Sequence, residues 1–417
     1  DFLASSVFND PQLSGVLRIF SLAIPFQMLY KNGASLAKAF RRMEYITYVD
    51  KLYRSLATFG ITAVLIYRGW GLEGAIIGQF VAIVTSGMIM LYLAQYKIYP
   101  MIQRNFKWEG NERKELLSYS WPIFLSGAIG LSTSWADTVL LGYFSTSSSV
   151  GVYNAAMPTA AMLTLFASQI SNVLFPTISE YYGKGKKQKS IELTSISLKW
   201  IFFFTFPGLI IMILFPNQIL NLLFGQEYVG GAVALSVLGT AYFIRTITVH
   251  AGSYINSEEM TKLQLYNSVI ISVLNVILNA VLIPGFKFGA LVIPELGVSG
   301  AAVATAISLT LGSILAVLEV YFLFDVQPYS IKRFFPSTLA TIMAASTTYL
   351  SFHHFFETVP KLMLIPALVL FGTIYLVFYV LLGGVSENDK EIIRAIENKT
   401  GFKLEEYLEK VERFSLV

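Results

Sequence analysis

The sequence of 417 residues contains no cysteine and only three histidines. The lack of cysteine excludes disulfides, thiolate metal sites and a cysteine nucleophile. Two of the histidines, His353 and His354, are adjacent in a predicted loop, and the sequence has no HExxH motif or other cluster with metal-ligand spacing. We therefore predict no metal centre and no resident cofactor.

Charged residues are scarce as well. They make up 13% of the chain, against about 25% in ordinary soluble domains, whereas 55% of the residues are hydrophobic. The net charge of +4 does not indicate a nucleic-acid partner, because the cations lie in loops between hydrophobic segments and form no basic patch with interleaved aromatics. We interpret them as topology signals and as contacts to membrane lipids.

Hydrophobic runs are what this chain has in excess. A transmembrane helix needs roughly 20 apolar residues to cross a hydrocarbon core of about 30 Å. Eleven segments meet that requirement, at 13–36, 49–68, 71–96, 116–142, 148–176, 195–215, 230–255, 264–284, 297–323, 334–352 and 360–383. The sequence thus predicts an all-α, polytopic transmembrane helix bundle with eleven spans.

Lysine and arginine alternate between the two ends of these spans. The loop after the first span holds Lys38, Arg41 and Arg42, the next loop holds only Arg68, and loop 97–115 is rich again. By the positive-inside rule the rich loops and the C-terminal tail are cytoplasmic, which puts residues 1–12 outside. Because those residues contain no signal peptide, we expect an odd number of helices upstream of the present start.

A short element occurs twice at the start of a span, as GLEGA at 71–75 and as GVSGA at 297–301. Each copy follows a span that ends in AVLI, at 63–66 and at 280–283. Small residues at helix starts also serve simple close packing, which is the alternative interpretation. The shared order of helices favours an internal duplication, as in many secondary transporters.

The duplication predicts two pseudo-symmetric six-helix lobes, of which the first is incomplete. We expect the second half of the first lobe at 1–96, a cytoplasmic loop between the lobes at 97–115 and the second lobe at 116–325. An extra helix pair follows at 326–383, and a cytoplasmic helical tail occupies 384–417. This organisation leaves about three helices of the first lobe outside the sequence.

Four motifs in the middle of the chain carry a family resemblance. They are SWPIFLS at 120–126, DTVLLGYF at 137–144, VGVYNAA at 150–156 and LFPTIS at 174–179. Together they resemble the polysaccharide-flippase (Wzx-like) branch of the multidrug/oligosaccharidyl-lipid/polysaccharide exporter superfamily. Members typically have fourteen helices, so the resemblance implies that this chain contains helices four to fourteen.

The resemblance also implies a function. Such a protein passes a lipid-linked oligosaccharide from the inner to the outer leaflet of a prokaryotic plasma membrane by alternating access, without covalent chemistry. The implied partners are a sugar on a polyprenyl pyrophosphate carrier, membrane lipids and a coupling H⁺ or Na⁺. We therefore expect a transporter and not an enzyme.

Three cations within or near the spans are candidates for substrate binding. A charge near the bilayer centre costs about 2.5–3.5 kcal/mol, so it should face a cavity or a partner. Arg18 and Arg245 are separated, to within one residue, by the interval between the two repeats, and guanidinium groups match phosphate oxygens. The alternatives are that Arg18 snorkels outward and that Arg245 pairs with a carboxylate. Lys31 is the third candidate, again with snorkelling as its alternative.

Two polar residues follow from the resembling motifs. Asp137 lies within a predicted span and is the candidate for a proton or sodium site, with a role as the counter-ion of an arginine as the alternative. Asn154 lies on the next helix, four residues before Pro158, and is a candidate for contact with the sugar. A proline at this place frees a backbone carbonyl and kinks the helix.

Two other functions remain to be weighed. A cation-coupled multidrug exporter of the same superfamily predicts that acids dominate the cavity, whereas Asp137 is outnumbered here by Arg18, Lys31 and Arg245. A membrane glycosyltransferase or polymerase usually presents acids on a sizeable external loop, and the outer loops predicted here have about 14 residues at most.

Overall fold

A computed structural model gives the structure of this chain. It describes residues 13–40, 42–98, 135–251, 261–288, 291–329, 331–355 and 363–384, together with residues 8, 114, 117, 120, 121, 124 and 254. The chain divides into two compact units, unit 1 (1–120) and unit 2 (121–417). The predicted loop at 97–115 and the tail after residue 384 lie largely outside the described residues.

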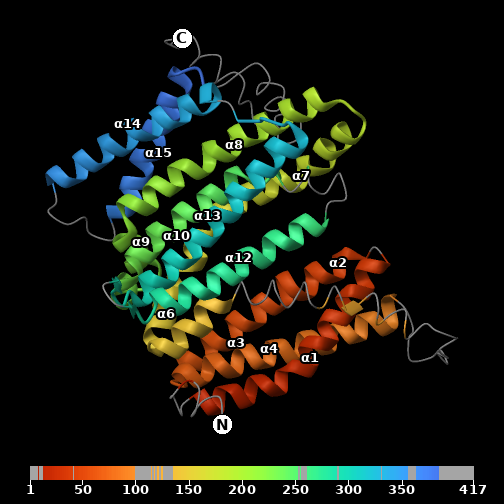
Figure 1. Cartoon of the computed structure of the whole chain (residues 1–417). Coiled ribbons are helices and arrows are strands. Elements are labelled where there is room, and N and C mark those ends of the chain that lie inside the picture. Colours follow the sequence, from red (N-terminus) through yellow and green to blue (C-terminus); the bar gives the residue numbers. More distant parts are fainter. Residues whose placement is uncertain are drawn as a thin grey trace. The chain divides into compact units, whose positions relative to one another are not determined.

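Unit 1 consists of helices, coloured red to orange in Figure 1. They are α1 (Leu13–Ala39), α2 (Met43–Ile46), the π-helix η2 (Thr47–Arg54), α3 (Ser55–Tyr67), α4 (Gly71–Leu93) and the π-helix η3 (Ala94–Ile98). Close approach of α1 to α4 depends on glycine, because a Cβ on Gly87 would overlap the backbone carbonyl of Phe26. Small residues at such crossings are typical of membrane helices.

Unit 2 holds most of the remaining helices and one hairpin. After a helical segment at 135–144 come α6 (Ser147–Ala161), α7 (Leu163–Gly183), α8 (Lys187–Leu214), α9 (Pro216–Leu223), the 3₁₀-helix η4 (Gln226–Gly231), α10 (Ala232–Ile247), α12 (Thr261–Leu282), β1 (Phe286–Phe288), β2 (Leu291–Ile293), α13 (Gly297–Phe324), α14 (Ile331–Phe355) and α15 (Leu364–Leu381). Its largest core cluster joins the segment at 135–144 to α6, α8, α10 and α13, through side chains such as Leu141, Tyr153 and Leu238.

The described residues contain seven helices that are long and apolar enough to cross a membrane, or eight if a bent pair is one span. That pair is Ser147–Ala161 and Leu163–Ser171, with a bend of 41°. The predicted all-α, polytopic helix bundle is thereby confirmed. Predicted spans 49–68 and 334–352 are helical but more polar, since the first holds Asp50, Lys51 and Arg54 and the second is rich in serine and threonine. Most of span 116–142 lies outside the described residues.

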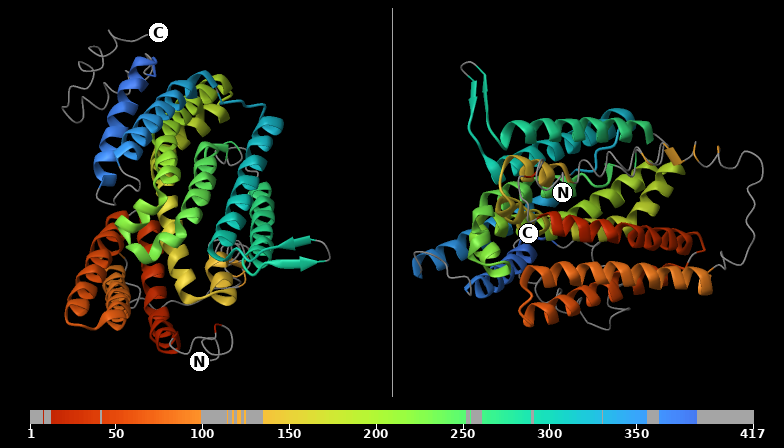
Figure 2. Two further views of the ribbon diagram at one scale, coloured as in Figure 1. Left: turned by 90° about the vertical axis from the view of Figure 1, so that its left-hand side faces the viewer. Right: turned by 90° about the horizontal axis from the view of Figure 1, so that it is seen from below.

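The loop between α12 and α13 forms a small antiparallel hairpin. Phe286 pairs with Ile293 and Phe288 with Leu291, after a turn at Gly285 with φ 78°. Each strand consists of residues with high β-propensity apart from Lys287, which explains the local pairing. The hairpin projects beyond the end of α12 in both views of Figure 2.

The two copies of the repeated element adopt the same local structure. Gly71 and Gly297 both have positive φ, at 47° and 51°, which a side chain would oppose. A Cβ on Gly74 would lie 2.9 Å from the Cβ of Leu65, and one on Gly300 would overlap the backbone carbonyl of Leu282. The second glycine of each copy therefore packs against the same leucine of the preceding AVLI segment.

Candidate functional site

The most completely buried acid in the described chain is Asp137, which is 2% exposed. Its carboxylate accepts four hydrogen bonds, all from neutral groups. The Tyr153 hydroxyl and the Thr305 hydroxyl donate to Oδ2, at 2.7 Å and 2.6 Å. The Nδ2 groups of Asn275 and Asn279 donate to Oδ1, at 3.1 Å and 2.6 Å. We call these five residues the Asp137 cluster.

Four elements bring the cluster together. Asp137 lies in the helical segment at 135–144, Tyr153 on α6, the two asparagines on α12 and Thr305 on α13. Asn275 and Asn279 are four residues apart and therefore lie on one face of α12. The Nδ2 of Asn279 also donates a hydrogen bond of 2.9 Å to the backbone carbonyl oxygen of Asn275, which fixes the orientation of the Asn279 side chain.

Two amide oxygen atoms of the Asp137 cluster are available as ligands. The Oδ1 atoms of Asn275 and Asn279 are both buried without a hydrogen-bond partner in the described structure. A buried acceptor without a partner costs roughly 1–3 kcal/mol. Carboxylate, amide and hydroxyl oxygens are the ligands that hard cations prefer. This set of oxygen ligands therefore fits a small hard cation such as Na⁺ better than it fits a transition metal.

No arginine or lysine of the described part of the chain forms an ion pair with Asp137. The alternative that Asp137 is the counter-ion of an arginine thus finds no partner among these residues. Nor do three or more histidine, aspartate or glutamate residues gather there as metal ligands. Any cation at Asp137 would be held by one acid and by neutral oxygen atoms.

Asn154 lies at the edge of the Asp137 cluster. It is exposed on α6, next to the buried Tyr153, and its Oδ1 accepts a hydrogen bond of 3.4 Å from the hydroxyl of Thr138. The structure therefore brings together two of the five residues predicted from the sequence, Asp137 buried and Asn154 exposed.

Arg245 is exposed near the end of α10. Its guanidinium makes no hydrogen bond or ion pair with any residue that the structure describes. One helical turn before it, Ala241 contributes to a groove of about 490 Å³ between α10 and α13. The lining residues are Val237, Thr240, Ala241, Ala306, Ile307, Thr310, Leu311 and Ile314. An unpaired cation therefore lies one turn along α10 from a mainly apolar groove.

Arg18 and Lys31 lie on α1, in unit 1, and both are exposed. Because Arg18 and Arg245 belong to different units, their predicted placement around a common cavity stays a prediction. The side chains of Arg18 and Lys31 reach the surface of their helix, which is compatible with contact to substrate and equally with snorkelling.

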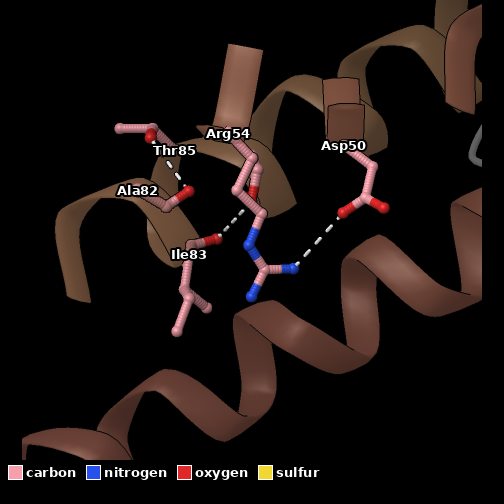
Figure 3. Close-up of polar contacts among 6 residues, drawn as sticks. Asp50, Arg54, Ala82, Ile83 and Thr85 are labelled. Atoms are coloured by element: carbon pink, nitrogen blue, oxygen red, sulfur yellow. Dashed lines mark hydrogen bonds and ion pairs between the residues drawn. The ribbon is translucent and has the colours of Figure 1, made fainter. Parts of the chain in front are cut away.

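Unit 1 has a groove of its own, of about 690 Å³, along η2 and α3. Asp50, Arg54, Thr58 and Thr62 are among the residues that line it. The Arg54 guanidinium lies 3.7 Å from the Asp50 carboxylate and 6.0 Å from the centre of the Tyr30 ring. Figure 3 marks the contact between Arg54 and Asp50 with a dashed line. This acid therefore has the cationic partner that Asp137 lacks.

A comparison with known families decides the affiliation of the chain. Residues 1–234 match the model of a family described as polysaccharide biosynthesis protein, which is more than half of the sequence. The chain belongs to this family. The resemblance to polysaccharide flippases that the motifs indicated is thereby confirmed.

Two relatives in the archaeon Haloferax volcanii agree with the family. The protein named "Probable flippase AglR" is 30% identical over 282 residues, which cover 66% of this chain and 55% of the relative. "Probable low-salt glycan biosynthesis flippase Agl15" is 29% identical over 202 residues, covering 48% of this chain and 41% of the relative. The chain thus spans about half the length of these relatives.

A solved structure gives the fold of the family member. The chain is similar to the lipid II flippase MurJ in an inward closed conformation, with a TM-score of 0.66 and 18% identity, over 87% of this chain and 73% of that one. At this identity the likeness shows the fold alone. This family member is therefore a multi-pass membrane protein with the helical fold of MurJ.

Sequence reasoning missed four of the five residues of the Asp137 cluster. Tyr153 was part of a motif but was not selected as a site residue, and Asn275, Asn279 and Thr305 were not considered. A signal was present, because two asparagines four residues apart within an apolar span must share one face and need a buried partner. The identity of that partner depends on the tertiary structure.

Proposed function

We propose that this chain forms part of a flippase that moves lipid-linked oligosaccharide from the inner to the outer leaflet of a prokaryotic plasma membrane, by alternating access. The C-terminus would be cytoplasmic, in line with the distribution of cations. The sugar carrier would be a polyprenyl pyrophosphate. In this proposal the two lobes rock around the substrate, and the protein performs no covalent chemistry. Family membership and the flippase relatives support it.

The observation that carries the proposal is the unpaired Arg245 beside an apolar groove. A guanidinium on a transmembrane helix needs an anionic partner, and phosphate oxygens match its geometry. The groove of about 490 Å³ that begins one turn away offers an apolar surface for the first isoprenoid units of the same lipid. Phosphate and lipid would then bind side by side on α10, with Asn154 available for the sugar and Arg18 and Lys31 contributing from unit 1.

We further propose that the Asp137 cluster couples this movement to a cation. The four neutral donors hold the carboxyl group in place, while the two unpartnered amide oxygens remain available as ligands. Binding of Na⁺ or H⁺ would change the charge of the cluster next to Asn154. Since α6, α12 and α13 all contribute side chains, that change would alter how these helices pack.

The organisation predicted from the repeats belongs to the same proposal. Residues 1–96 would form part of a first lobe, and 116–325 would form the second lobe. The loop at 97–115 would connect the lobes, while 326–383 would add a helix pair and 384–417 a cytoplasmic tail. The two copies of the Gly-opened helix, with matching glycine contacts, support the duplication.

The test is translocation in proteoliposomes that contain the full-length protein. A fluorescent lipid-pyrophosphate-sugar is placed in one leaflet, and its appearance in the other is measured by a quencher, with and without Na⁺ and proton gradients. We expect Arg245→Ala to slow translocation about tenfold, equivalent to about 1.4 kcal/mol of lost phosphate binding. Arg68→Ala, which removes an exposed cation directly after the end of α3, is the matched control.

Two outcomes would overturn the proposal. If Arg245→Ala translocates as fast as Arg68→Ala, then the phosphate does not bind at Arg245. If the protein moves no lipid-linked sugar but exports organic cations down a gradient, then it is a cation-coupled drug exporter. Against that second function, the cluster acid Asp137 is buried, whereas Arg18, Lys31 and Arg245 are exposed.

A further inference from the structure

Unit 2 contains a second acid in a membrane-spanning helix that has a neutral partner. Glu319, on α13, accepts hydrogen bonds from the single Nδ2 of Asn267 to both carboxylate oxygens, each at 2.8 Å. Glu319 forms no ion pair among the described residues. A carboxylate has about four acceptor positions, so one amide nitrogen leaves most of them unused. An acid in such a place is costly and therefore calls for a functional explanation.

The partner of Glu319 stands in one row with the asparagines of the Asp137 cluster. Asn267, Ile271, Asn275 and Asn279 follow each other at intervals of four residues on α12. Residues with this spacing share a helix face, and the row extends over about 18 Å at 1.5 Å per residue. Asn267 holds one acid near one end of the row, and the other two asparagines hold Asp137 near its other end.

α13 carries a matching set of small and polar residues on the opposing side. Helices α12 and α13 are neighbours in Figure 1 and pack against each other. Thr305 joins the Asp137 cluster, the buried Ser308 follows, and Glu319 closes the row at the other end. On α12 the buried Ser272 lies between the two sets of asparagines. Polar side chains therefore lie near both ends of the seam between these helices.

One apolar contact interrupts the seam. A Cβ on Gly312 would overlap the Cδ1 of Ile271 and would lie 3.1 Å from its Cγ1. The Ile271 side chain thus occupies the space that a side chain at position 312 would fill. It separates the Glu319 end of the seam from the Asp137 end, and an isoleucine offers no ligand to a cation.

We infer that the seam between α12 and α13 is the path by which the coupling cation reaches Asp137, with Glu319 as the acid that receives it first and Ile271 as the barrier between the two. The inference rests on the proposed cation coupling at Asp137. By the predicted topology, the Glu319 end is cytoplasmic. The cation is Na⁺ or H⁺, which share the carboxylate as their ligand. In the conformation described here the barrier is closed, since Ile271 packs on Gly312.

The experiment measures cation binding and cation access separately. The full-length protein is reconstituted in proteoliposomes sorted by orientation, and the equilibrium binding of ²²Na⁺ is measured along with its rate of uptake from the cytoplasmic side and from the opposite side. A parallel series replaces the Na⁺ gradient by a pH gradient and an internal pH dye. The arm that responds identifies the cation.

Two variants test the path. We expect Glu319→Gln, which keeps the shape of the side chain, to slow access from the cytoplasmic side about tenfold while equilibrium binding stays the same. We expect Ile271→Ala, which opens the seam, to accelerate access from that side. The matched control is Glu73→Gln, an exposed acid at the start of α4 that should change neither quantity. Thermal unfolding of each variant shows whether it is folded.

The outcomes separate this inference from the proposed function. If Asp137→Asn still binds the cation at equilibrium, cation coupling at Asp137 is wrong. If Asp137→Asn loses binding but Glu319→Gln and Ile271→Ala behave like Glu73→Gln, the Asp137 site stands and the path along the seam is wrong. If folded Glu319→Gln slows access equally from both sides, Glu319 supports the helix pair and does not admit the cation.

Discussion

The helices that precede the two Gly-opened elements carry different side chains at equivalent positions. Counting back from the shared leucine, Leu65 in one copy and Leu282 in the other, the first copy reads Asp50, Arg54, Thr58 and Thr62, and the second reads Asn267, Ile271, Asn275 and Asn279. In the first copy an acid and a base lie in the row itself. In the second copy the row holds only amides and one isoleucine.

The two copies therefore differ in the groups that contact a carboxylate. The Asp50 carboxylate lies 3.7 Å from the Arg54 guanidinium within the same helix, so its charge is already compensated (Figure 3). In the second copy the acids come from neighbouring helices, and amides hold them without adding positive charge. No lysine or arginine among the described residues forms an ion pair with Asp137. The helix before the first Gly-opened element thus holds an acid beside an arginine, whereas the helix before the second holds amides that contact acids of neighbouring helices.

Replacement of Asp137, which the asparagines of the second copy contact, should have the largest effect on cation-driven translocation. We expect Asp137→Asn to reduce cation-driven translocation about 100-fold, equivalent to about 3 kcal/mol, because the only ionised ligand of the cluster is lost. The amide keeps the size of the side chain, but its NH₂ group would face donors that now contact a carboxylate. Translocation with and without the gradient, in the proteoliposome assay, gives the measurement. Gradient-driven translocation at the level of the unmodified protein would show that the contrast between the copies has no role in coupling.

Loss of a single donor should have a smaller effect. Tyr153 is 0% exposed, and Tyr153→Phe removes its 2.7 Å hydrogen bond to Asp137 while its ring still fills the core. We expect a decrease of about 1–2 kcal/mol in the free energy of unfolding, with cation affinity reduced less than tenfold because three donors remain. Thermal unfolding and ²²Na⁺ binding provide both values.

The control for Tyr153→Phe lies in the same unit. Tyr143 is 56% exposed at the end of the segment at 135–144, so Tyr143→Phe removes a hydroxyl that has no place in the Asp137 cluster. It should leave unfolding and cation binding unchanged. Equal effects of the two substitutions would mean that the hydroxyl of Tyr153 does not support the cluster.

Features that depend on neighbouring residues could be predicted from the sequence, whereas contacts between residues far apart in the chain could not. Spans and the two Gly-opened helices follow from local composition, so the all-α membrane fold and the repeat were predicted. Asp137 was recognised as a candidate because an acid within an apolar run stands out. Its partners were not, since Thr305 comes 168 positions later in the chain and only folding brings it within 2.6 Å. The hairpin at 286–293 was missed for a different reason, because two strands of three residues fall below the length at which a pattern is visible.

In the first copy, the corresponding substitution should affect stability slightly and coupling not at all. The side chains of Arg54 and Asp50 are 20% and 32% exposed, and ion pairs near a surface contribute about 0–1 kcal/mol. We therefore expect Asp50→Asn to lower the free energy of unfolding by less than about 1 kcal/mol, and to leave the dependence of translocation on the cation gradient unchanged. Loss of coupling in Asp50→Asn, to the degree expected for Asp137→Asn, would contradict the assignment of the cation to unit 2 alone.

The smallest effect on stability is expected for the removal of an exposed ion pair outside the spans. Near the end of α7 the Lys184 ammonium donates a hydrogen bond to the Glu180 carboxylate, and this contact lowers the pKa of Glu180 below its usual value. A lowered pKa in the folded protein means that the pair stabilises the fold at neutral pH, and that the contribution is lost as the pH falls through that pKa. Because both side chains are exposed, with 61% and 59% of their surfaces accessible, solvent and salt screen the attraction. Thermal unfolding of Glu180→Gln against the unmodified protein should differ only slightly at pH 7 and low salt, and the difference should vanish in acid or at high ionic strength. A difference that persisted in acid would show that Glu180 acts through packing and not through its charge.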